Sequence, residues 1–415
     1  MNESVIKLSD NLGKLSVFRN ILNTDVVIAL RELLSSLDEL DYLAETTFYK
    51  GSYLSQYGEL CRAIYDAGGD LGLFVLDFVR SGDDFYFRKL KDLDETSSSL
   101  KELNRAAEID METLQQLSEL TPWDVLSCFN VDGLREQSPD TLPGWTNTQV
   151  LIRSEVLGIM SDFRTRGYGI FREASMFKVR DGKLIPVMNP DYQKISQLYE
   201  YERERNMVLQ NTEALATGKA ASNVLLYGDA GTGKSTTVKA AAAAYFDEGV
   251  RLVEFNKSQV GEIPAMAEKL YGNPLKFIFF IDDLTFTEND SDYYALKGIL
   301  EGNISGTGNN VVVYATSNRR HLVKESMDDR NGDDLHLNDT LQETMSLASR
   351  FGLTITFMKP AKDEYLSIVE NMALERGLAV DEDLFTRAEA FAIRMNGRSP
   401  RTAKQFITQA LIGLQ

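Results

Sequence analysis

The chain has 415 residues, 43% of them hydrophobic and 26% charged, which is an ordinary composition for a globular protein of two or three domains. No segment is apolar for long enough to cross a membrane, and residues 1–10 lack the features of a signal peptide. We therefore expect a cytoplasmic protein that does not use a membrane as a partner. Two cysteines, Cys61 and Cys128, are too few for a disulfide framework or a zinc site and predict buried thiols.

The balance of charge is strongly acidic. The formal net charge is −18, and residues 1–190 contain 20 basic and 30 acidic side chains. Such a surface repels the phosphate backbone of nucleic acids. Nucleic acid is therefore a disfavoured partner, although a local basic strip would still be compatible with these numbers.

Residues 1–190 contain no chemical motif, but their apolar residues recur at helical spacing. This spacing predicts helices over residues 25–43, 53–66, 72–79 and 149–166. Residues 89–116 predict a long, charged and solvated helix, or two helices broken near 97–99, and residues 171–187 predict a small hairpin around Asp181-Gly182. We expect a mainly α-helical accessory domain over residues 1–190, used either to bind a partner or to pack in an oligomer.

The strongest motif lies between residues 223 and 237, where a short apolar strand, a glycine-rich turn and an alanine-rich helix follow one another. The turn fits the pattern GxxxxGKS, in which glycines let backbone N–H groups approach phosphates and the following helix points its positive end at them. The pattern predicts that Lys234 binds the β- and γ-phosphates of a nucleotide and that the Ser235 hydroxyl binds Mg²⁺. The predicted nucleotide-binding residues are Gly228, Asp229, Ala230, Gly231, Thr232, Gly233, Lys234, Ser235 and Thr236.

Polar residues stand at the ends of two further apolar strands. The strand predicted over residues 276–283 ends in Asp282 and Asp283, and the strand predicted over 310–316 is followed by Ser317 and Asn318. The carboxyl ends of parallel strands line one crevice, so these side chains are expected beside the phosphate loop. Asp282 is the predicted Mg²⁺ carboxylate, and Asn318 is placed to reach the attacking water.

Strands and helices alternate after residue 191. Strands predicted over residues 224–227, 251–256, 276–283, 310–316 and 353–358 indicate a parallel, five-stranded α/β core with helices on both faces, over residues 191–360. Helices alone follow, over 363–376, 381–395 and 400–414, and predict a small helical lid over residues 361–415. A polar helix over 192–205 is expected before the first strand, in a segment that forms one wall of the adenine pocket.

The order of these motifs along the chain resembles that of AAA+ ATPases. The motifs are the phosphate loop, Asp282-Asp283, Thr316-Ser317-Asn318, Ser349-Arg350-Phe351-Gly352 and a lid segment from Gly397 to Lys404. More closely, residues 191–415 look like a family of uncharacterised bacterial AAA+ proteins, catalogued as a domain of unknown function, whose core is similar to that of helicase loaders. The resemblance implies ATP and Mg²⁺ as cofactors and a homo-oligomer, with a hexamer as one option, whose subunits share the active sites.

The resemblance also implies roles for single residues. Asp282 acts at Mg²⁺, and Asp283 stands where most AAA+ proteins have a glutamate that polarises the attacking water. Aspartate is shorter by one methylene group, so the base reaches the water less well and slow turnover is expected. Asn318 matches the first sensor and Arg401, on the lid, matches the second. Arg350 matches an arginine finger delivered to the neighbouring subunit, and the competing candidates for that role are Arg319 and Arg320.

The motifs lead to three hypotheses. The first is a slow ATPase that acts as a nucleotide-driven switch or remodeller of an unknown protein client, with hydrolysis releasing Arg350 from the γ-phosphate. The second is a loader ATPase associated with nucleic acid, in which phosphate contacts would come from Arg319, Arg320, Arg394, Arg398 and Arg401. The third is a P-loop phosphotransferase, which would need an acceptor pocket and a base. The histidines of the chain are His321 and His336.

Overall fold

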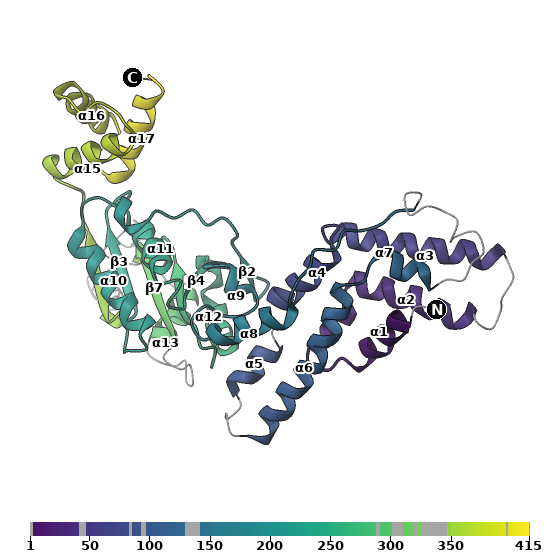
Figure 1. Ribbon diagram of the computed structural model, residues 1–415. Coiled ribbons are helices and arrows are strands. Elements are labelled where there is room, and N and C mark those ends of the chain that lie inside the picture. Colours follow the sequence, from purple (N-terminus) through teal and green to yellow (C-terminus); the bar gives the residue numbers. More distant parts are fainter. Residues whose placement is uncertain are drawn as a thin grey trace. The chain divides into compact units, whose positions relative to one another are not determined.

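The computed structural model describes residues 3–40, 47–82, 85–92, 97–128, 142–287, 291–300, 310–318, 323–324, 347, 349–395 and 397–414. The chain forms two compact units, a helical unit (Met1–Phe163 with Gly167–Glu173) and an α/β unit (Arg164–Arg166 with Ala174–Gln415), shown in Figure 1. None of the helices in the described ranges is long and apolar enough to cross a membrane.

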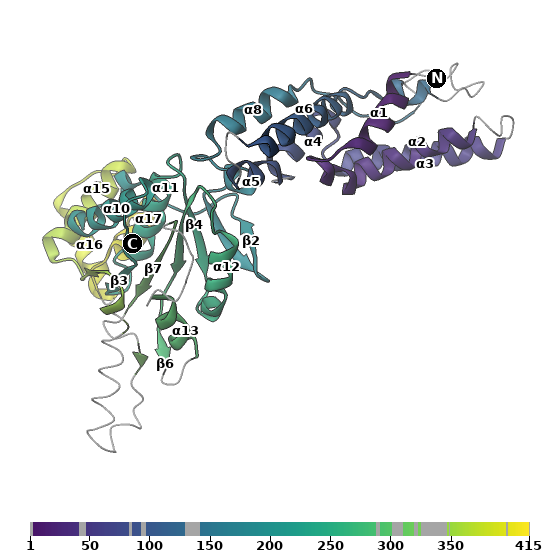
Figure 2. The same cartoon turned by 90° about the horizontal axis from the view of Figure 1, so that it is seen from below.

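The helical unit confirms the mainly α-helical region predicted at the start of the chain. Its helices bury their apolar faces in one shared core, to which Cys61 and Cys128 also belong. Helices α2 and α3 lie side by side, as Figure 2 shows. The helices are α1 (Glu3–Lys14), α2 (Asp25–Leu40), α3 (Thr47–Asp66), α4 (Leu71–Asp77), α5 (Phe85–Asp92), α6 (Ser98–Ser118), α7 (Pro122–Ser127), α8 (Ile152–Asp162) and α9 (Ile170–Glu173).

The prediction of a solvated helix over residues 89–116 is wrong for α6. This helix begins after Ser97, whose hydroxyl accepts a hydrogen bond from the Leu100 N–H, so the predicted break near 97–99 is confirmed. One face of α6 is buried and contacts α1, α4 and α8. Charged residues occupy the opposite face, and their number makes the apolar stripe difficult to recognise in the sequence. The buried apolar residues of the stripe are Ala107, Met111, Leu114 and Leu117.

A buried carboxylate joins α6 to the turn that follows α1. Asp110 is 1% exposed, and its Oδ2 atom accepts hydrogen bonds from the backbone N–H groups of Ser16, Val17 and Phe18 at 2.9, 2.6 and 3.0 Å. Hydrogen bonds to a charged acceptor are stronger than neutral ones, and three N–H groups would lose their partner together if the carboxylate were removed.

The α/β unit is built around a seven-stranded sheet, in which five parallel strands confirm the predicted core. Their order across the sheet is β4, β5, β7, β3 and β9. Strand β5 is buried along both faces, as expected for a central parallel strand, and α10 and α11 pack against one face of the sheet. These strands are β3 (Val224–Gly228), β4 (Val250–Phe255), β5 (Lys276–Ile281), β7 (Val311–Ser317) and β9 (Leu353–Phe357).

Two further strands correct the predicted count of five. Strand β1 (Met176–Arg180) pairs in parallel with β4, and β2 (Lys183–Pro186) pairs with β1 in antiparallel fashion. The hairpin predicted around Asp181-Gly182 is confirmed, but it extends the sheet and lies in the α/β unit instead of the accessory region. Its turn is encoded locally by φ values of 52° and 66°, whereas its pairing with β4 depends on a segment far along the chain.

The helix before β3 begins later than predicted. The sequence predicts a helix over residues 192–205, but α10 spans Glu202–Ala216. Glu200 and Tyr201 have left-handed φ values of 58° and 57°, which a right-handed helix excludes. The Tyr201 hydroxyl donates to the Met358 carbonyl at 2.6 Å, so contacts at the end of β9 outweigh local helix propensity here.

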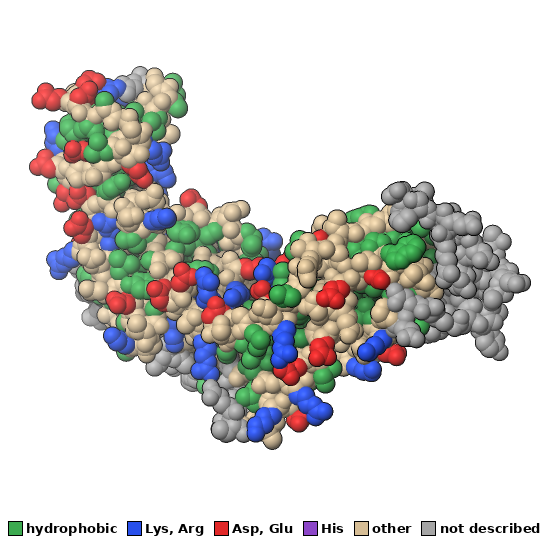
Figure 3. All heavy atoms as spheres, viewed as in Figure 1, with side chains coloured by type: hydrophobic (Ala, Val, Ile, Leu, Met, Phe, Trp, Pro, Cys, Tyr) green, Lys and Arg blue, Asp and Glu red, His purple; other side chains and the backbone are tan. Residues whose placement is uncertain are grey.

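The last three helices confirm the predicted lid, since α15 (Lys362–Glu375), α16 (Glu382–Arg394) and α17 (Pro400–Leu411) share a core of their own. Three more helices connect the strands: α11 (Lys234–Ala244), α12 (Ile263–Lys269) and α13 (Ser291–Leu300). A separate parallel pair joins β6 (Phe286–Thr287) to β8 (Val323–Lys324). Acidic and basic side chains are interspersed over the described part of the face seen in Figure 3.

We expect Asp110→Ala to destabilise the helical unit by about 3 kcal/mol, because three backbone N–H groups lose a charged acceptor. Both tryptophans, Trp123 and Trp145, belong to this unit, so fluorescence during urea unfolding reports on it alone. Glu112→Ala, at an exposed position of the same helix, is the matched control and should be neutral. Equal midpoints for the two variants would show that the Asp110 bonds add no net stability.

Candidate functional site

The phosphate-loop motif joins β3 to α11. Its three glycines have left-handed φ values, 136° at Gly228, 79° at Gly231 and 92° at Gly233, which other residues adopt only under strain. Gly228 has a second constraint, because an added Cβ would lie 2.0 Å from the Phe357 carbonyl oxygen of β9. The turn therefore ends at the amino end of α11, which begins at Lys234 and presents the positive end of its dipole.

Lys234 is held inside this turn. Its side chain is 5% exposed, and its ammonium donates to the carbonyls of Gly228 and Asp229 at 3.0 and 2.6 Å and to Asn318 Oδ1 at 3.0 Å. Burial lowers the pKa of Lys234, an effect opposed by the nearby carboxylates of Asp229, Asp283 and Asp282. The ammonium is thus in place to exchange carbonyl acceptors for the oxygens of a phosphate.

The two predicted Mg²⁺ residues lie together. The Ser235 hydroxyl donates to Asp282 Oδ1 at 2.6 Å, and the Thr316 hydroxyl donates to the same oxygen at 2.5 Å. Mg²⁺ usually keeps several waters and takes one or two protein oxygens besides those of phosphates. A hydroxyl and a carboxylate beside a phosphate-binding turn fit that requirement.

Asp283 and Asn318 complete a chain of hydrogen bonds across the ends of the strands. Asn318 accepts from Lys234, as described above, and its Nδ2 donates to Asp283 Oδ1 at 2.8 Å. The Asp283 N–H donates to the Thr316 hydroxyl at 3.0 Å, and Asp283 has a left-handed φ of 53°. The structure therefore brings Asp283, Asn318 and Lys234, three of the predicted site residues, into one network.

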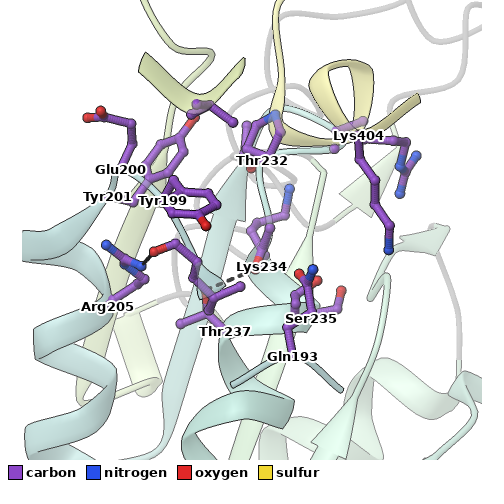
Figure 4. Close-up of a pocket in the computed structure, with 18 of the residues that line it drawn as sticks. Gln193, Tyr199, Glu200, Tyr201, Arg205, Thr232, Lys234, Ser235, Thr237 and Lys404 are labelled. Atoms are coloured by element: carbon purple, nitrogen blue, oxygen red, sulfur yellow. Dashed lines mark hydrogen bonds between the residues drawn. The ribbon is translucent and has the colours of Figure 1, made fainter. Parts of the chain in front are cut away.

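A cavity of about 570 Å³ opens beside the turn, between the core and the lid (Figure 4). Arg401, an exposed residue of α17, lines it, and the Arg401 N–H donates to the Gly231 carbonyl at 3.2 Å. The lid thereby contacts the phosphate turn directly. The residues that line the cavity from the segment before and within α10 are Gln193, Gln197, Leu198, Tyr199, Glu200, Tyr201 and Arg205.

This segment before α10 also binds the lid. Glu375 of α15 accepts from Gln197 Nε2 at 3.0 Å and from the Tyr199 hydroxyl at 3.3 Å. The Ser367 hydroxyl of α15 donates to Glu200 Oε1 at 2.7 Å. One wall of the cavity is therefore fixed to the core and to the lid at once.

Several residues of the site escaped the sequence analysis. A helix over residues 192–205 was expected, in a segment that forms one wall of the pocket, but the single residues that line the cavity were not predicted. Their contacts depend on the left-handed backbone at Glu200 and Tyr201. Thr316 was noted only as part of a motif. Its position two residues before Asn318 could have indicated that it also belongs to the site. Lys404 lines the cavity from α17, one turn after Arg401.

Arg350 does not line the cavity. It precedes β9, whose first residue, Leu353, pairs with Val224 at the amino end of β3, whereas the phosphate turn follows the carboxyl end of β3. Arg350 and Lys234 therefore stand at opposite ends of the sheet. The competing arginines and the two histidines lie outside the described residues: Arg319, Arg320, His321 and His336.

Comparisons with known proteins give one family and several partial structural similarities. A family model described as "Protein of unknown function (DUF815)" matches residues 172–413, and no curated protein matches the chain. A point mutant of RuvB from Thermotoga maritima is 16% identical, with a TM-score of 0.38, over 53% of this chain and 64% of that one. The chain thus spans less than two thirds of that RuvB chain.

Two other solved structures are similar to the same degree. DnaA from Aquifex aeolicus, bound to AMPPCP, is 16% identical over 55% of this chain and 67% of that one, with a TM-score of 0.37. The FIGL-1 AAA domain in complex with ADP is 16% identical over 54% of this chain and 75% of that one, with a TM-score of 0.36. Function is therefore inferred from the residues of this chain.

Gly231→Ala should loosen the contact between the turn and the lid. The added Cβ would lie 3.0 Å from Ser399 Oγ and 3.2 Å from Arg401 Cβ, and the left-handed backbone adds about 1–3 kcal/mol of strain. We expect faster hydrogen exchange at the Arg401 amide, measured by mass spectrometry. Gly261→Ala, where an added Cβ meets no atom within 4 Å, is the control, and equal exchange in both variants would contradict the expectation.

Proposed function

The chain belongs to the DUF815 family, whose model covers more than half of it, and we propose that it is a slow ATPase of the AAA+ type. The observation that carries the proposal is the network that joins Lys234 and Ser235 to the two carboxylates, beside a cavity of about 570 Å³. A cavity of this size fits a small-molecule ligand such as a nucleotide. The network supplies a cation for phosphates, oxygen ligands for Mg²⁺ and a carboxylate base.

ATP binds with its phosphates at the turn and its adenine toward residues 193–205. Backbone N–H groups at the start of α11 hold the phosphates, and Lys234 exchanges its contacts with the carbonyls for phosphate oxygens. Ser235 and Asp282 would hold Mg²⁺, with the Ser235 proton still directed at Asp282 Oδ1. Bound Mg²⁺ neutralises charge on the phosphate oxygens. Arg401 adds a positive charge from the lid.

Hydrolysis needs a base on the side of the γ-phosphate, and Asp283 is that base. Its carboxylate takes a proton from water as the water oxygen bonds to the γ-phosphorus, and the bond from that phosphorus to the bridging oxygen breaks. ADP and phosphate then leave. Asn318 supports this role because its Nδ2 donates to Asp283 Oδ1 at 2.8 Å and holds the carboxylate. The short aspartate side chain makes turnover slow.

Arg350 acts on the γ-phosphate of a neighbouring subunit. Its place at the amino end of β9 puts it at the far end of the sheet from Lys234, which supports a role between subunits over one within its own site. A contact of this head-to-tail kind generates a ring or a filament of identical subunits. ATP hydrolysis releases the contact, and the helical unit passes the change on to a protein client.

The hypothesis of a nucleic-acid loader has less support than that of an ATPase switch, because two of the arginines proposed to bind phosphates contact other side chains of the lid. Arg398 forms two hydrogen bonds with the Glu389 carboxylate, at 2.8 and 2.9 Å, which lower the pKa of Glu389. The Arg394 guanidinium lies 5.7 Å from the centre of the Phe391 ring. On the face shown in Figure 3, charges of both signs are mixed over the described residues, a pattern unlike a phosphate-binding strip.

Steady-state ATP hydrolysis with Mg²⁺ at increasing protein concentration tests the shared site. We expect specific activity to rise with concentration and Arg350→Ala to lower it by about 10³-fold or more while ATP binding persists, because an arginine finger acts only on the transition state. Arg180→Ala, at an exposed residue of β1 in the same unit, is the matched control. Turnover that is independent of concentration and of Arg350 would exclude sharing.

Mixing two inactive variants is a second test of the same idea. Lys234→Ala should abolish ATP binding in its own subunit but leave its Arg350 intact for a neighbour. Mixed with Arg350→Ala, it should restore activity at about a quarter of the interfaces if subunits assemble at random in head-to-tail contacts. A mixture as inactive as its components would contradict a shared site.

Asp283→Asn should separate binding from chemistry. The amide keeps the shape of the carboxylate but accepts no proton, so kcat should fall by about 10²–10⁴-fold while the Kd for ATP changes little. Asp247→Asn, which alters a surface carboxylate paired with Arg166 in the same unit, is the control. Unchanged turnover in Asp283→Asn, measured as phosphate release, would remove Asp283 from the mechanism.

A further inference from the structure

Thr316 occupies the centre of the network that joins the two carboxylates. It lies near the end of β7, is 2% exposed, and pairs in register with Leu226 of β3. Its hydroxyl donates to Asp282 Oδ1 at 2.5 Å and accepts from the Asp283 N–H at 3.0 Å. A single hydroxyl therefore contacts both acidic residues that follow β5, using its one proton and one of its lone pairs.

The hydrogen bond from Thr316 adds to the difference between the two oxygens of the Asp282 carboxylate. Asp282 Oδ1 receives two hydroxyl protons, from Ser235 and from Thr316, whereas Oδ2 has no hydrogen-bond partner among the described residues. The carboxylate is thus held through Oδ1, while Oδ2 belongs to an exposed residue that lines the cavity. Oxygen atoms that are fixed in this way bind a hard cation, or the water molecules around it, without first losing rotational freedom.

The second bond of Thr316 holds the backbone of Asp283. The left-handed φ of 53° is strained for any residue with a Cβ, and such a conformation persists only where neighbouring bonds hold it. Two bonds to Thr316 do so here, since its hydroxyl accepts the Asp283 N–H and its carbonyl accepts the Leu284 N–H at 2.7 Å. Loss of the hydroxyl would leave the Asp283 N–H without this acceptor.

We propose that Thr316 is a positioning residue, which fixes the Asp282 carboxylate for Mg²⁺ and the Asp283 carboxylate for the attacking water. The proposal rests on the ATPase function proposed above and adds a residue that acts through the two carboxylates without touching the nucleotide. Packing alone does not require threonine at this position, because valine has the same shape and suits a buried strand equally well. The hydroxyl is the part of the side chain that carries the role.

Three substitutions of Thr316 separate the effect of the hydroxyl from the effect of the side-chain shape. Thr316→Val removes the hydroxyl and keeps the branched shape, while Thr316→Ser keeps the hydroxyl and removes the methyl group. Thr316→Ala serves as a second variant without a hydroxyl and differs from Thr316→Ser by one oxygen atom. Thr212→Val is the control, because it removes another buried hydroxyl of the same unit, one that contacts the Val208 carbonyl and the Tyr314 hydroxyl.

The decisive measurement is the Mg²⁺ concentration that gives half-maximal binding of a fluorescent ATP analogue, with kcat and thermal stability measured in parallel. We expect Thr316→Val and Thr316→Ala to raise that concentration and to lower kcat by about 10–100-fold, the usual effect of removing a partner of a metal ligand. Thr316→Ser should stay close to the wild type, and Thr212→Val should need no more Mg²⁺ than the wild type.

Each result has a definite meaning. A normal Mg²⁺ requirement in a folded variant without the hydroxyl would overturn the proposal, and so would a loss of thermal stability alone. If Thr316→Val does not fold, the comparison of serine with alanine decides in its place. If the wild type binds the analogue with Mg²⁺ but hydrolyses no ATP, the proposed function fails, and the Mg²⁺ requirement still tests Thr316.

Discussion

Parallel pairing of β5, β7 and β3 is the constraint on which the site depends. Because these strands run in the same direction, their carboxyl ends bring Asp282, Asn318 and the phosphate turn to one edge of the sheet. The register pairs Ile281 with Ala315 and Leu226 with Thr316. A slip of one residue would turn Thr316 to the other face and break its bonds to both carboxylates. Burial of β5 and β7 along their length opposes such a slip, so the core of the sheet sets the geometry of the site.

The phosphate turn is also held from two further sides. The Asp229 N–H donates to the Phe357 carbonyl of β9 at 3.0 Å, and the Lys359 N–H donates to Asp229 Oδ2 at 2.9 Å. The lid also contacts the turn, through the bond from the Arg401 N–H to the Gly231 carbonyl. The lid follows directly from β9 along the chain, so one continuous segment touches the turn at both of these sides. A change in the turn on phosphate binding would therefore act on both ends of that segment.

The sequence predicted the parts of this structure that local pattern determines. The phosphate motif, the buried strands before Asp282 and Asn318 and the three lid helices follow from short-range periodicity and composition. The failures involve contacts between distant segments. Strand β1 joins the sheet through β4, the start of α10 is set by the bond from Tyr201 to Met358, and one face of α6 is buried by helices far along the chain. The role of Thr316 was not predicted for the same reason, because it depends on a neighbouring strand.

The conformation of Asp283 connects the chemistry of the site to the residue type found there. Consecutive residues of a strand point to opposite faces, so two acidic residues at the end of β5 would ordinarily diverge. The left-handed backbone at Asp283 turns the chain, so that Asp282 contacts Thr316 of β7 and Asp283 contacts Asn318, the residue that follows β7. Aspartate and asparagine enter this conformation more readily than longer side chains do. Aspartate therefore suits this turn better than the longer glutamate would. In the mechanism proposed above, the short reach of the base follows from the backbone that places it.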